Sequence, residues 1–428
     1  MNVGDQTIFA VSSGSPPAAI GIIRISGPKA RVALGALARR EIPPRRPSLG
    51  RLFSASGNVL DEALLLWFPG PATATGEDLT ELHCHGGRAV LTAVCQELKN
   101  MDGLRPALEG EFTRRSFANG RIDLAEAEGL ADLLEAETEL QRASAISSVS
   151  GNLSGKVEEW RDSVLKLSAQ VEAVLDFSDE DDVSELPAGF ASNIGMLAET
   201  LNEWLLRPRS ERLKDGFRVV LAGPPNSGKS TLFNTLVESE AAITSPIAGT
   251  TRDIIERSVG IMGVPFVFVD TAGLREDGAE QIEVIGIERA RSEVSRGDCV
   301  LWLGDEGEGP DGAWEVAARM DSPDFIPKQS ARHIVSAQTS AGVNELKQDL
   351  VDFALKALPK PGETALNTRQ HERLGEAHEA LVSAMDKDDF LLIGEDLRRA
   401  RLAFDRLIGR STTEDMLDAL FGRFCIGK

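Results

Sequence analysis

The sequence contains no tyrosine, and aromatic residues make up only 5% of it. A rich aromatic platform for stacking nucleic-acid bases is therefore not expected. The chain has four cysteines, too few and too widely spaced for a disulfide framework, which indicates a reducing compartment. No segment approaches the roughly 18 apolar residues of a membrane span, and the first residues lack the pattern of a secretion signal. These absences predict a cytoplasmic protein without a membrane segment.

The charge balance excludes another class, a protein with a uniformly basic surface for nucleic acid. Lys and Arg number 46 against 67 Asp and Glu, which gives −21. Two segments run against this balance: residues 21–51 carry eight basic residues and one acid (+7), and residues 398–428 carry seven and four (+3). They could contact nucleic-acid phosphates or be solvated faces. Residues 176–185 hold six carboxylates, which fit a solvated loop or a docking surface for a basic partner.

The 428 residues suggest two or three domains. Apolar runs at 19–25 and 63–68 predict strands, 88–98 a helix, and 124–206 a helical layer. Buried strands are predicted at 217–222, 264–269, 299–303 and 334–336, and helices return from Thr364. The fold class is multidomain: an α/β N-terminal domain, a helical central domain and an inserted doubly wound α/β domain. The N-terminal domain is predicted at 1–119, the inserted domain at 213–358, and the helical domain in two segments, 120–212 and 359–428.

The strongest motif is Gly223-Pro-Pro-Asn-Ser-Gly-Lys-Ser230, between a predicted strand and a predicted helix at 231–237. It matches G-x-x-x-x-G-K-[ST], whose backbone N–H groups surround nucleotide phosphates. Lys229 would add its charge at the β- and γ-phosphates, and Ser230 would offer a hydroxyl to Mg²⁺. The motif predicts a P-loop nucleotide hydrolase.

Two further segments follow in the order that a nucleotide switch requires. Asp270-Thr271-Ala272-Gly273 comes after a strand, so the acid could support Mg²⁺ and the glycine N–H could sense the γ-phosphate. Gly249-Thr-Thr-Arg-Asp253 precedes it and could supply a threonine hydroxyl to the metal. Each segment is weak alone, but the order and spacing support the P-loop assignment.

With these motifs, AITSPIAGTTRD at 242–253 and DTAGLRE resemble the potassium-activated, translation-factor-class GTPases. GIIRISGP, FPGP, TGED, HGG, GEFTR, IDLAEAE and the terminal FCIGK resemble the TrmE-type family of bacterial tRNA-modification GTPases. The resemblance covers essentially the whole chain. It implies an N-terminal folate-binding and dimerisation domain and a GTPase domain inserted into a helical domain.

The resemblance also implies activity and partners. Family members are homodimers that form a heterotetramer or larger complex with an MnmG-like FAD protein. Together they add an aminomethyl-type (carboxymethylaminomethyl) group to C5 of the wobble uridine of certain tRNAs. The one-carbon unit comes from a formyl or methylene tetrahydrofolate, and GTP hydrolysis needs Mg²⁺ and K⁺.

Site residues follow from the same resemblance. Lys229, Glu283 and Cys425 would be catalytic, with Glu283 orienting the attacking water. K⁺ would be held by Asn226, Ser245, Ile247 and Thr250, and could supply the positive charge of an arginine finger. Mg²⁺ would be held by Ser230 and Thr251. The remaining nucleotide contacts would be Ser227, Gly228, Thr231, Pro246, Ala248, Gly249, Asp270, Thr271, Ala272, Gly273, Ser336 and Ala337.

The folate would be bound by Arg24, Glu81, Arg121 and Lys428, with Arg121 standing where the family often has lysine. Bland interpretations stay open: surface ion pairs for these four residues, a solvated carboxylate for Glu283 and a buried inert thiol for Cys425. His83 and His85 could suggest zinc, but no second ligand cluster has zinc spacing.

One expected motif is missing from the sequence. P-loop GTPases carry N-K-x-D after the following strand, and between Leu303 and Ser336 the nearest candidate is Pro327-Lys-Gln-Ser330. Asp305 or Asp324 could substitute for the missing acid, or base selectivity could be relaxed. Because of this gap, a scaffold with a decayed nucleotide site stays open. A regulatory ribosome-assembly-type GTPase switch without modification chemistry stays open as a second alternative.

Overall fold

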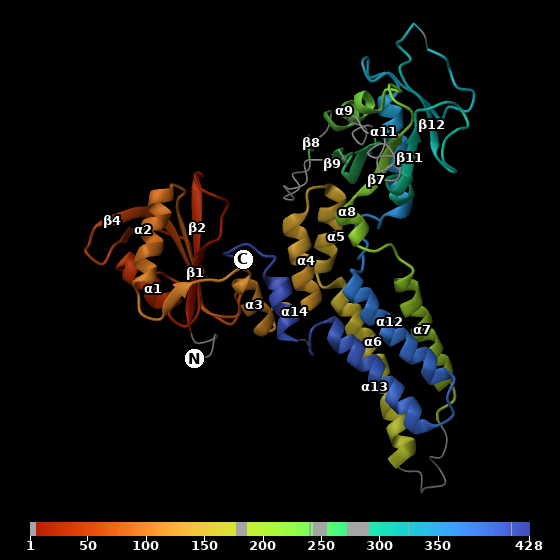
Figure 1. The fold of residues 1–428 in the computed structure, drawn as a ribbon. Coiled ribbons are helices and arrows are strands. Elements are labelled where there is room, and N and C mark those ends of the chain that lie inside the picture. The colour runs from red at the N-terminus through yellow and green to blue at the C-terminus, as the bar shows by residue number, and fades with distance from the viewer. Residues whose placement is uncertain are drawn as a thin grey trace, which may run out of the picture. The chain divides into compact units, whose positions relative to one another are not determined.

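The structure, a computed structural model, describes residues 6–176, 186–238, 241–242, 255–271, 291–323, 325–411 and 413–428. The chain forms two compact units, shown in Figure 1. The first consists of Met1–Ala131 with Phe404–Lys428, and the second of Asp132–Ala403. The four domain boundaries predicted from the sequence stay a prediction.

The first unit is built on a six-stranded sheet of order β3-β4-β5-β2-β1-β6. Neighbouring strands are antiparallel except β1 and β6, which are parallel. The predicted strands at 19–25 and 63–68 are confirmed as β2 and β4. The strands are β1 (Thr7–Val11), β2 (Ile20–Ser26), β3 (Ser48–Phe53), β4 (Val59–Phe68), β5 (Leu79–His85) and β6 (Leu104–Pro106).

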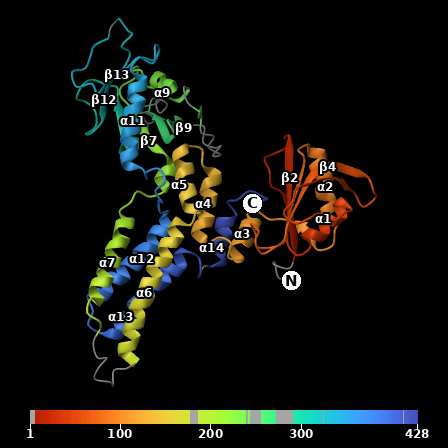
Figure 2. The same ribbon diagram turned by 180° about the vertical axis from the view of Figure 1, so that it is seen from behind.

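Helices cover both faces of this sheet. Helices α1 (Ala30–Ala38) and α2 (Arg88–Lys99) form one core with residues of β1 to β5. Phe112 of α3 (Glu111–Ala118) packs with Ile8 and Ala10 on β1 in a separate core. Figure 2 shows α1 and α2 beside the sheet. Because β1 is covered on both faces, its residues Thr7 to Ala10 are all buried.

The C-terminal end of the chain belongs to the first unit. Helix α14 (Glu414–Phe421) packs against α4 (Leu124–Glu135) in an apolar core, and the Phe421 ring lies 6.2 Å from that of Phe117. Gly110 has φ 62°, and a Cβ there would lie 2.2 Å from the Phe421 carbonyl oxygen. Only glycine permits this approach, which holds the end of α14 against the start of α3.

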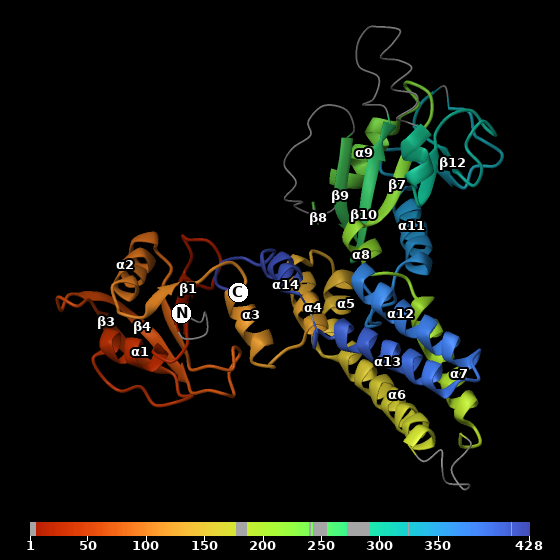
Figure 3. The same cartoon turned by 60° about the horizontal axis from the view of Figure 1, so that its bottom comes forward.

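The second unit contains the predicted helical layer and, inserted into it, the second sheet. Helices α6, α7, α12 and α13 run side by side, as Figures 1 and 3 show, and Trp160 meets Trp204 edge to face at 5.4 Å. The helices are α5 (Glu139–Val149), α6 (Asn152–Asp176), α7 (Phe190–Leu205), α8 (Glu211–Asp215), α12 (Thr368–Met385) and α13 (Phe390–Leu407). The chain leaves this layer after α8 and returns at α12, as predicted.

The inserted sheet has the order β13-β12-β11-β7-β10-β9-β8, and its five strands from β13 to β10 are parallel. The predicted doubly wound fold is confirmed, and β12 is a strand that the sequence analysis missed. Its elements are β7 (Phe217–Ala222), α9 (Lys229–Glu238), β8 (Ala241–Ala242), β9 (Ile255–Ile261), β10 (Val264–Asp270), β11 (Cys299–Trp302), β12 (Trp314–Ala317), β13 (His333–Ile334) and α11 (Val343–Ala357).

The inserted sheet is joined to the helical layer through α5. The Leu140 N–H donates to the Gly263 carbonyl oxygen (3.0 Å) in the turn between β9 and β10, and Leu140 lies in the apolar core of the sheet. Gln141 Nε2 donates to the Leu213 carbonyl oxygen of α8 (2.8 Å). Across the described part of the chain, no helix is long and apolar enough to cross a membrane.

Candidate functional site

The predicted phosphate loop lies between β7 and α9. Gly223 (φ 147°), Asn226 (φ 60°) and Gly228 (φ 96°) adopt positive φ, which bends the backbone around the centre of the loop. A Cβ on Gly223 would lie 3.0 Å from the Gly304 backbone nitrogen, so a side chain would push the loop away from the sheet. Such a turn leading into a helix N-terminus is a preformed anion site.

Lys229, the first residue of α9, points back into this loop. Its side chain is buried, and Nζ donates to the Pro224 carbonyl oxygen at 2.7 Å. Burying an ammonium is costly unless donors find partners, so the loop holds this cation where a phosphate would meet it. Ser230 and Thr231 follow at the exposed start of the helix.

Asp270 and Thr271 are brought to the same edge of the sheet as the phosphate loop. Strands β7 and β10 are parallel neighbours, and Asp270 is paired in register with Leu221. Asp270 is only 1% exposed, and Thr271 Oγ1 donates to the Leu221 carbonyl oxygen at 2.8 Å. The C-terminal end of β10, at Asp270, therefore lies beside the C-terminal end of β7, from which the phosphate loop begins.

The predicted Ser336–Ala337 loop also reaches this edge. Ser336 is fully buried, its N–H donates to the Ala341 carbonyl oxygen (2.9 Å), and its hydroxyl accepts from Thr339 N–H (3.1 Å). Thr235 Oγ1 of α9 donates to the Ala337 carbonyl oxygen at 3.2 Å. The loop is therefore tied to the helix that starts at Lys229.

Strand β12 corrects the search for the base-reading motif. The residues directly after it are Ala318-Arg319-Met320-Asp321, so an aspartate does occupy the fourth position. A hydrogen bond with the Ser336 side chain lowers the pKa of Asp321, as do a bond from its own backbone N–H and the charge of Arg319. The exposed Asp321 carboxylate is thereby kept ionised and oriented from the adjacent loop.

Arg319 occupies the lysine position of the same motif. It has φ 63°, its Nη1 donates to the Asn226 carbonyl oxygen at 3.3 Å, and its Cγ would lie 3.4 Å from a Cβ on Gly228. The residue therefore connects the strand end after β12 to the phosphate loop. Ala318 takes the asparagine position and keeps none of its polar groups.

Pro327–Ser330, the nearest candidate in the sequence, lies further from the end of β12, and its lysine has other partners. Lys328 Nζ donates to Glu315 Oε2 (2.6 Å) and to the Trp302 carbonyl oxygen (3.2 Å), so this lysine supports β11 and β12. The Asp305 carbonyl oxygen accepts from Trp302 Nε1, and Asp324 lies outside the described residues. A short run rich in β-branched and aromatic residues, WEVA, was the available indication of β12.

Several predicted nucleotide and metal residues lie outside the part of the chain that the structure describes. Their assignments stay predictions. They are Ser245, Pro246, Ile247, Ala248, Gly249, Thr250, Thr251, Ala272, Gly273 and Glu283.

The predicted folate residues all lie in the first unit, and two of them are in contact. Arg24 on β2 faces Glu81 on β5, donating from Nη2 (2.9 Å) and Nε (3.2 Å) to Oε1. The other oxygen, Oε2, lies 3.3 Å from His83 Nε2, and the Arg24 guanidinium lies 5.9 Å from the Phe112 ring centre. This is a half-buried polar site on the face of the sheet that α3 covers.

The C-terminal tail runs along the end of β1, next to β2. Ile426 forms a β-bridge with Glu109, and a Cβ on Gly427 (φ 100°) would lie 2.3 Å from the Val11 carbonyl oxygen. Glycine is therefore required immediately before Lys428, and the tail is held at the strand beside Arg24. Cys425 is exposed, so the buried-thiol interpretation of this residue was wrong.

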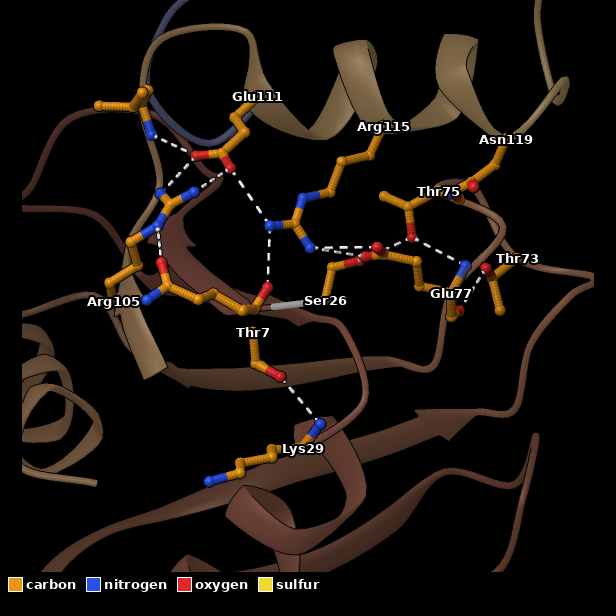
Figure 4. A network of polar contacts seen from close by, with 12 residues as sticks. Thr7, Ser26, Lys29, Thr73, Thr75, Glu77, Arg105, Glu111, Arg115 and Asn119 are labelled. Atoms are coloured by element: carbon orange, nitrogen blue, oxygen red, sulfur yellow. Dashed lines mark hydrogen bonds and ion pairs between the residues drawn. The ribbon is translucent and has the colours of Figure 1, made fainter. Parts of the chain in front are cut away.

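A network of polar contacts around Arg115 fixes the TGED turn, residues 75–78, against α3 (Figure 4). Arg115 Nη1 donates to both oxygens of Glu77 (3.1 and 3.0 Å), whose Oε2 also accepts from Ser26 Oγ (2.7 Å). Asn119 Nδ2 donates to the Thr75 carbonyl oxygen at 2.7 Å. The Cγ of Arg121 would lie 3.3 Å from a Cβ on Gly76 in this turn, so the network also sets the position of Arg121.

The same network contains a buried carboxylate, Glu111, at the start of α3. Burial by itself would raise the pKa of Glu111, but hydrogen bonds from Arg105 and Leu108 N–H and the charges of Arg105 and Arg115 lower it overall. Arg105 donates to Glu111 Oε2 at 2.7 Å. His83 and His85 contact Glu81 and Asp61, and the described residues contain no group of three His, Cys, Asp or Glu fit for a metal.

Known proteins resemble the chain over its whole length. The tRNA modification GTPase MnmE of Erythrobacter litoralis is 60% identical over 423 residues, covering 99% of this chain and 100% of that protein. That of Novosphingobium aromaticivorans is 58% identical (99% and 100%), and that of a Bradyrhizobium species 44% (100% of both). The G domain of T. maritima FeoB covers 32% of this chain and 98% of its own at 22% identity, with a TM-score of 0.23, too low to support a conclusion.

Two family descriptions also match. "GTP-binding protein TrmE N-terminus" covers residues 7–121, and "MnmE helical domain" covers residues 124–425. Together they span the N-terminal motifs and nearly all of the rest of the chain up to Cys425, which confirms the resemblance found in the motifs. The chain belongs to the MnmE (TrmE) family of tRNA modification GTPases.

Proposed function

We propose that this protein hydrolyses GTP and, with a flavoprotein of the MnmG type, adds a carboxymethylaminomethyl-type group to C5 of the wobble uridine of certain tRNAs. The observation that carries this proposal is the full-length match to tRNA modification GTPases at up to 60% identity. The buried Lys229 in a preformed phosphate loop supports the hydrolase activity. The match to the TrmE N-terminus argues against an assembly-type switch, which would not need that domain.

GTP and Mg²⁺ are the ligands that GTPase relatives imply, and the described residues suit both. The loop bends through positive φ at Gly223 and Gly228 into the N-terminus of α9, which suits phosphate, and Lys229 supplies the charge there. Ser230 would offer its hydroxyl to Mg²⁺, with Thr251 as a second ligand and Asp270 behind them. Bound Mg²⁺ would neutralise charge on the β- and γ-phosphates.

Guanine would be read by Asp321. A carboxylate oriented by Ser336 can accept from the two N–H groups on the edge of guanine, whereas adenine offers no such pair. Arg319, two residues before this acid, donates to the Asn226 carbonyl oxygen and would fix the position of Asp321 relative to the phosphate loop. The decayed-site interpretation loses its basis, because the motif retains the acid and a cation.

K⁺ is proposed as a further ligand, held by the side chains of Asn226 and Thr250 and the carbonyl oxygens of Ser245 and Ile247. Asn226 is exposed, and its αL backbone places it at the bend of the phosphate loop. A monovalent cation there would set positive charge against the phosphates in the transition state. Glu283 would orient the attacking water.

A formyl or methylene tetrahydrofolate would bind in the first unit, at Arg24, Glu81, Arg121 and Lys428. Folate carries carboxylates and a pterin with amide-like hydrogen-bonding edges, so a mixed set of guanidinium, ammonium and carboxylate groups suits it. The contact of Arg24 with Glu81 and the tail beside β1 support this site. Cys425, exposed near Lys428, would be the nucleophile in the modification chemistry.

The partners proposed with this function are a second copy of the chain, the FAD-containing MnmG-type protein in a heterotetramer or larger complex, and tRNA. All four cysteines are free thiols in the structure, which suits the reducing cytoplasm where tRNA is modified.

The first test is nucleotide hydrolysis by the purified protein, with GTP, ATP and XTP, in K⁺ and then in Na⁺. GTP preference with strong K⁺ stimulation is expected. K⁺ stimulation without base preference would contradict guanine recognition by Asp321. Equal rates in K⁺ and Na⁺ would contradict K⁺ binding by Asn226. No hydrolysis under any condition would overturn the GTPase proposal.

The second test concerns tRNA chemistry. Wobble uridines are analysed by mass spectrometry after incubation of tRNA with this protein, the flavoprotein, GTP and methylene tetrahydrofolate. Folate binding is measured separately by equilibrium dialysis with 5-formyltetrahydrofolate. Arg24→Gln should weaken it about tenfold or more, whereas Arg31→Gln, a matched exposed arginine in the same unit, should not. Folate binding without modified uridine would favour a regulatory role.

A further inference from the structure

The loop between α1 and β3 is densely basic. Residues 39–46, called the arginine loop here, contain Arg39, Arg40, Arg45 and Arg46, and all four side chains are exposed. They lie within eight consecutive residues, a stretch that spans at most about 25 Å. Four cations over that distance form the densest basic stretch within a segment of net charge +7, in a protein of net charge −21.

Three of the four guanidinium groups of this loop, those of Arg39, Arg40 and Arg45, are held in place by neutral partners. Arg39 Nη2 donates to the Ser54 carbonyl oxygen (3.1 Å), and the group lies 5.0 Å from the Phe53 ring centre. Arg40 donates to the carbonyl oxygen of Leu49 on β3. Such contacts restrict the side chains without neutralising them, so less conformational entropy remains to be lost on binding.

Arg45, near the end of the arginine loop, also donates to a carbonyl oxygen and lies near an aromatic ring. Its Nη2 donates to the Ala72 carbonyl oxygen, its guanidinium lies 5.9 Å from the Phe68 ring centre, and its backbone N–H donates to the Trp67 carbonyl oxygen (2.8 Å). Each of Arg39, Arg40 and Arg45 therefore keeps further N–H groups that can serve a bound anion.

Nearby acid does not cancel this charge. Glu41, the one acid within the loop, lies 3.4 Å from Arg31 on α1, which is not part of the loop. Arginines in other regions of the structure contrast with those of the loop. Arg332 contacts Asp349 at 2.8 Å, and Arg398 contacts Glu395 at 2.7 Å. The arginine loop is thus a region where positive charge is both ordered and uncompensated.

We propose that the arginine loop binds the phosphate backbone of tRNA. Planar guanidinium groups hydrogen-bond phosphate oxygens in pairs, which suits ordered arginines better than lysines. Contacts to the backbone rather than to bases fit a loop whose neighbouring rings, Phe53 and Phe68, are already covered by its own guanidiniums. The inference rests on the proposed tRNA modification and adds to it the surface that positions the substrate.

The size of the effect follows from counterion release. Each phosphate contact releases about 0.9 of a bound cation, so at about 0.1 M salt one contact contributes a factor of about 8 to affinity. Removing two arginines should therefore weaken binding about 60-fold and reduce the slope of log K against log salt by about 2.

The experiment compares two doubly substituted full-length proteins. Arg40→Gln with Arg46→Gln removes two charges from the loop. The control, Arg142→Gln with Lys156→Gln, removes two charges from exposed helix surfaces outside both basic segments, where each basic residue has an acidic partner. Binding of a fluorescently labelled, unmodified tRNA transcript is measured by anisotropy over a series of KCl concentrations. GTP hydrolysis without tRNA is measured for all proteins and should not change.

The loop variant should lose affinity and salt slope, while the control variant should stay close to the original protein. Equal binding by both variants would overturn the inference. Failure of the unsubstituted protein to bind tRNA would instead count against the proposed function. Arg46→Glu alone, which keeps the carbonyl contacts of the other three arginines, should show the same trend. If the Arg46→Glu protein differs in molecular mass from the original protein in light scattering, the loop joins copies of the chain. That result would also overturn the inference.

Discussion

Replacing Asp321 by asparagine is expected to move the base preference of the enzyme from guanine to xanthine. The structure places Asp321 four residues after the end of β12, with its carboxylate hydrogen-bonded to Ser336. Guanine offers two N–H donors on one edge, and a carboxylate offers two acceptor oxygens in the same plane. Xanthine carries a carbonyl in place of the exocyclic amine and therefore needs a donor, which the amide of asparagine supplies.

The magnitude follows from the number of bonds exchanged. Each hydrogen bond to a charged acceptor contributes a factor of about 10 to 100 to binding. Asp321 is exposed, so water competes for its carboxylate and the lower value applies. Two bonds then give about a 100-fold loss of kcat/KM for GTP. The ratio of kcat/KM for GTP to kcat/KM for XTP should fall by at least that factor, because XTP gains an interaction.

The assay is steady-state hydrolysis of GTP and XTP in K⁺ by the original protein, by Asp321→Asn and by the matched control Asp305→Asn. Retained XTP hydrolysis by Asp321→Asn would show that its fold is intact. Ser336→Ala should lower the GTP rate less than about tenfold, because it removes only the bond that orients the acid. If Asp321→Asn leaves the ratio of kcat/KM for GTP to kcat/KM for XTP unchanged, the assignment of Asp321 is refuted. If Asp305→Asn changes this ratio, Asp305 and not Asp321 reads the base.

Three further results are expected. Lys229→Ala should abolish binding of a fluorescent GTP analogue, since the phosphate charge loses its counterpart, whereas Lys328→Ala should retain it; equal loss in both would point to unfolding. At pH 8 an aromatic disulfide reagent should label Cys425 rapidly and Cys84 hardly at all, because burial raises the pKa of the Cys84 thiol to about 12; a fast phase that survives Cys425→Ser would contradict this. Glu111→Gln should destabilise α3 by about 3 kcal/mol, seen as faster hydrogen exchange there. Since the pKa of Glu111 is lowered in the folded state, its contribution to stability is present above the unfolded pKa and disappears as the pH falls through the folded one; protection factors of the α3 amides that stay constant as the pH is lowered through the acid range would argue against it.

Much of the fold was readable from local pattern. The run FRVVLA at 217–222 predicted β7 to the residue, because a strand buried on both faces is uniformly apolar. The phosphate loop was equally readable, since its glycines and its lysine are required by backbone geometry and charge at fixed spacing. The helical layer and its interruption by a sheet followed from a change of period along the chain.

Asp321, the residue proposed to read the base, could not be found in this way. Ala318-Arg319-Met320-Asp321 shares only its last residue with the usual motif, and the preceding strand β12 has four residues. Short strands carry little periodicity, so their identity depends on pairing with a neighbour, here β11. Only that register shows that Asp321 follows a strand end and meets Ser336, which is 15 residues further along the chain.

The sequence by itself determined the nucleotide chemistry and the family of this protein, because the phosphate loop and the family motifs are short segments with fixed spacing. The tertiary structure decided which groups act together. Arg24 on β2 contacts Glu81 on the neighbouring strand β5. Gly427, near the C-terminus, lies against Val11 on β1. Arg319, in the segment after β12, donates to the Asn226 carbonyl oxygen of the phosphate loop. Contacts between residues so distant in sequence depend on packing and register, which no local pattern encodes.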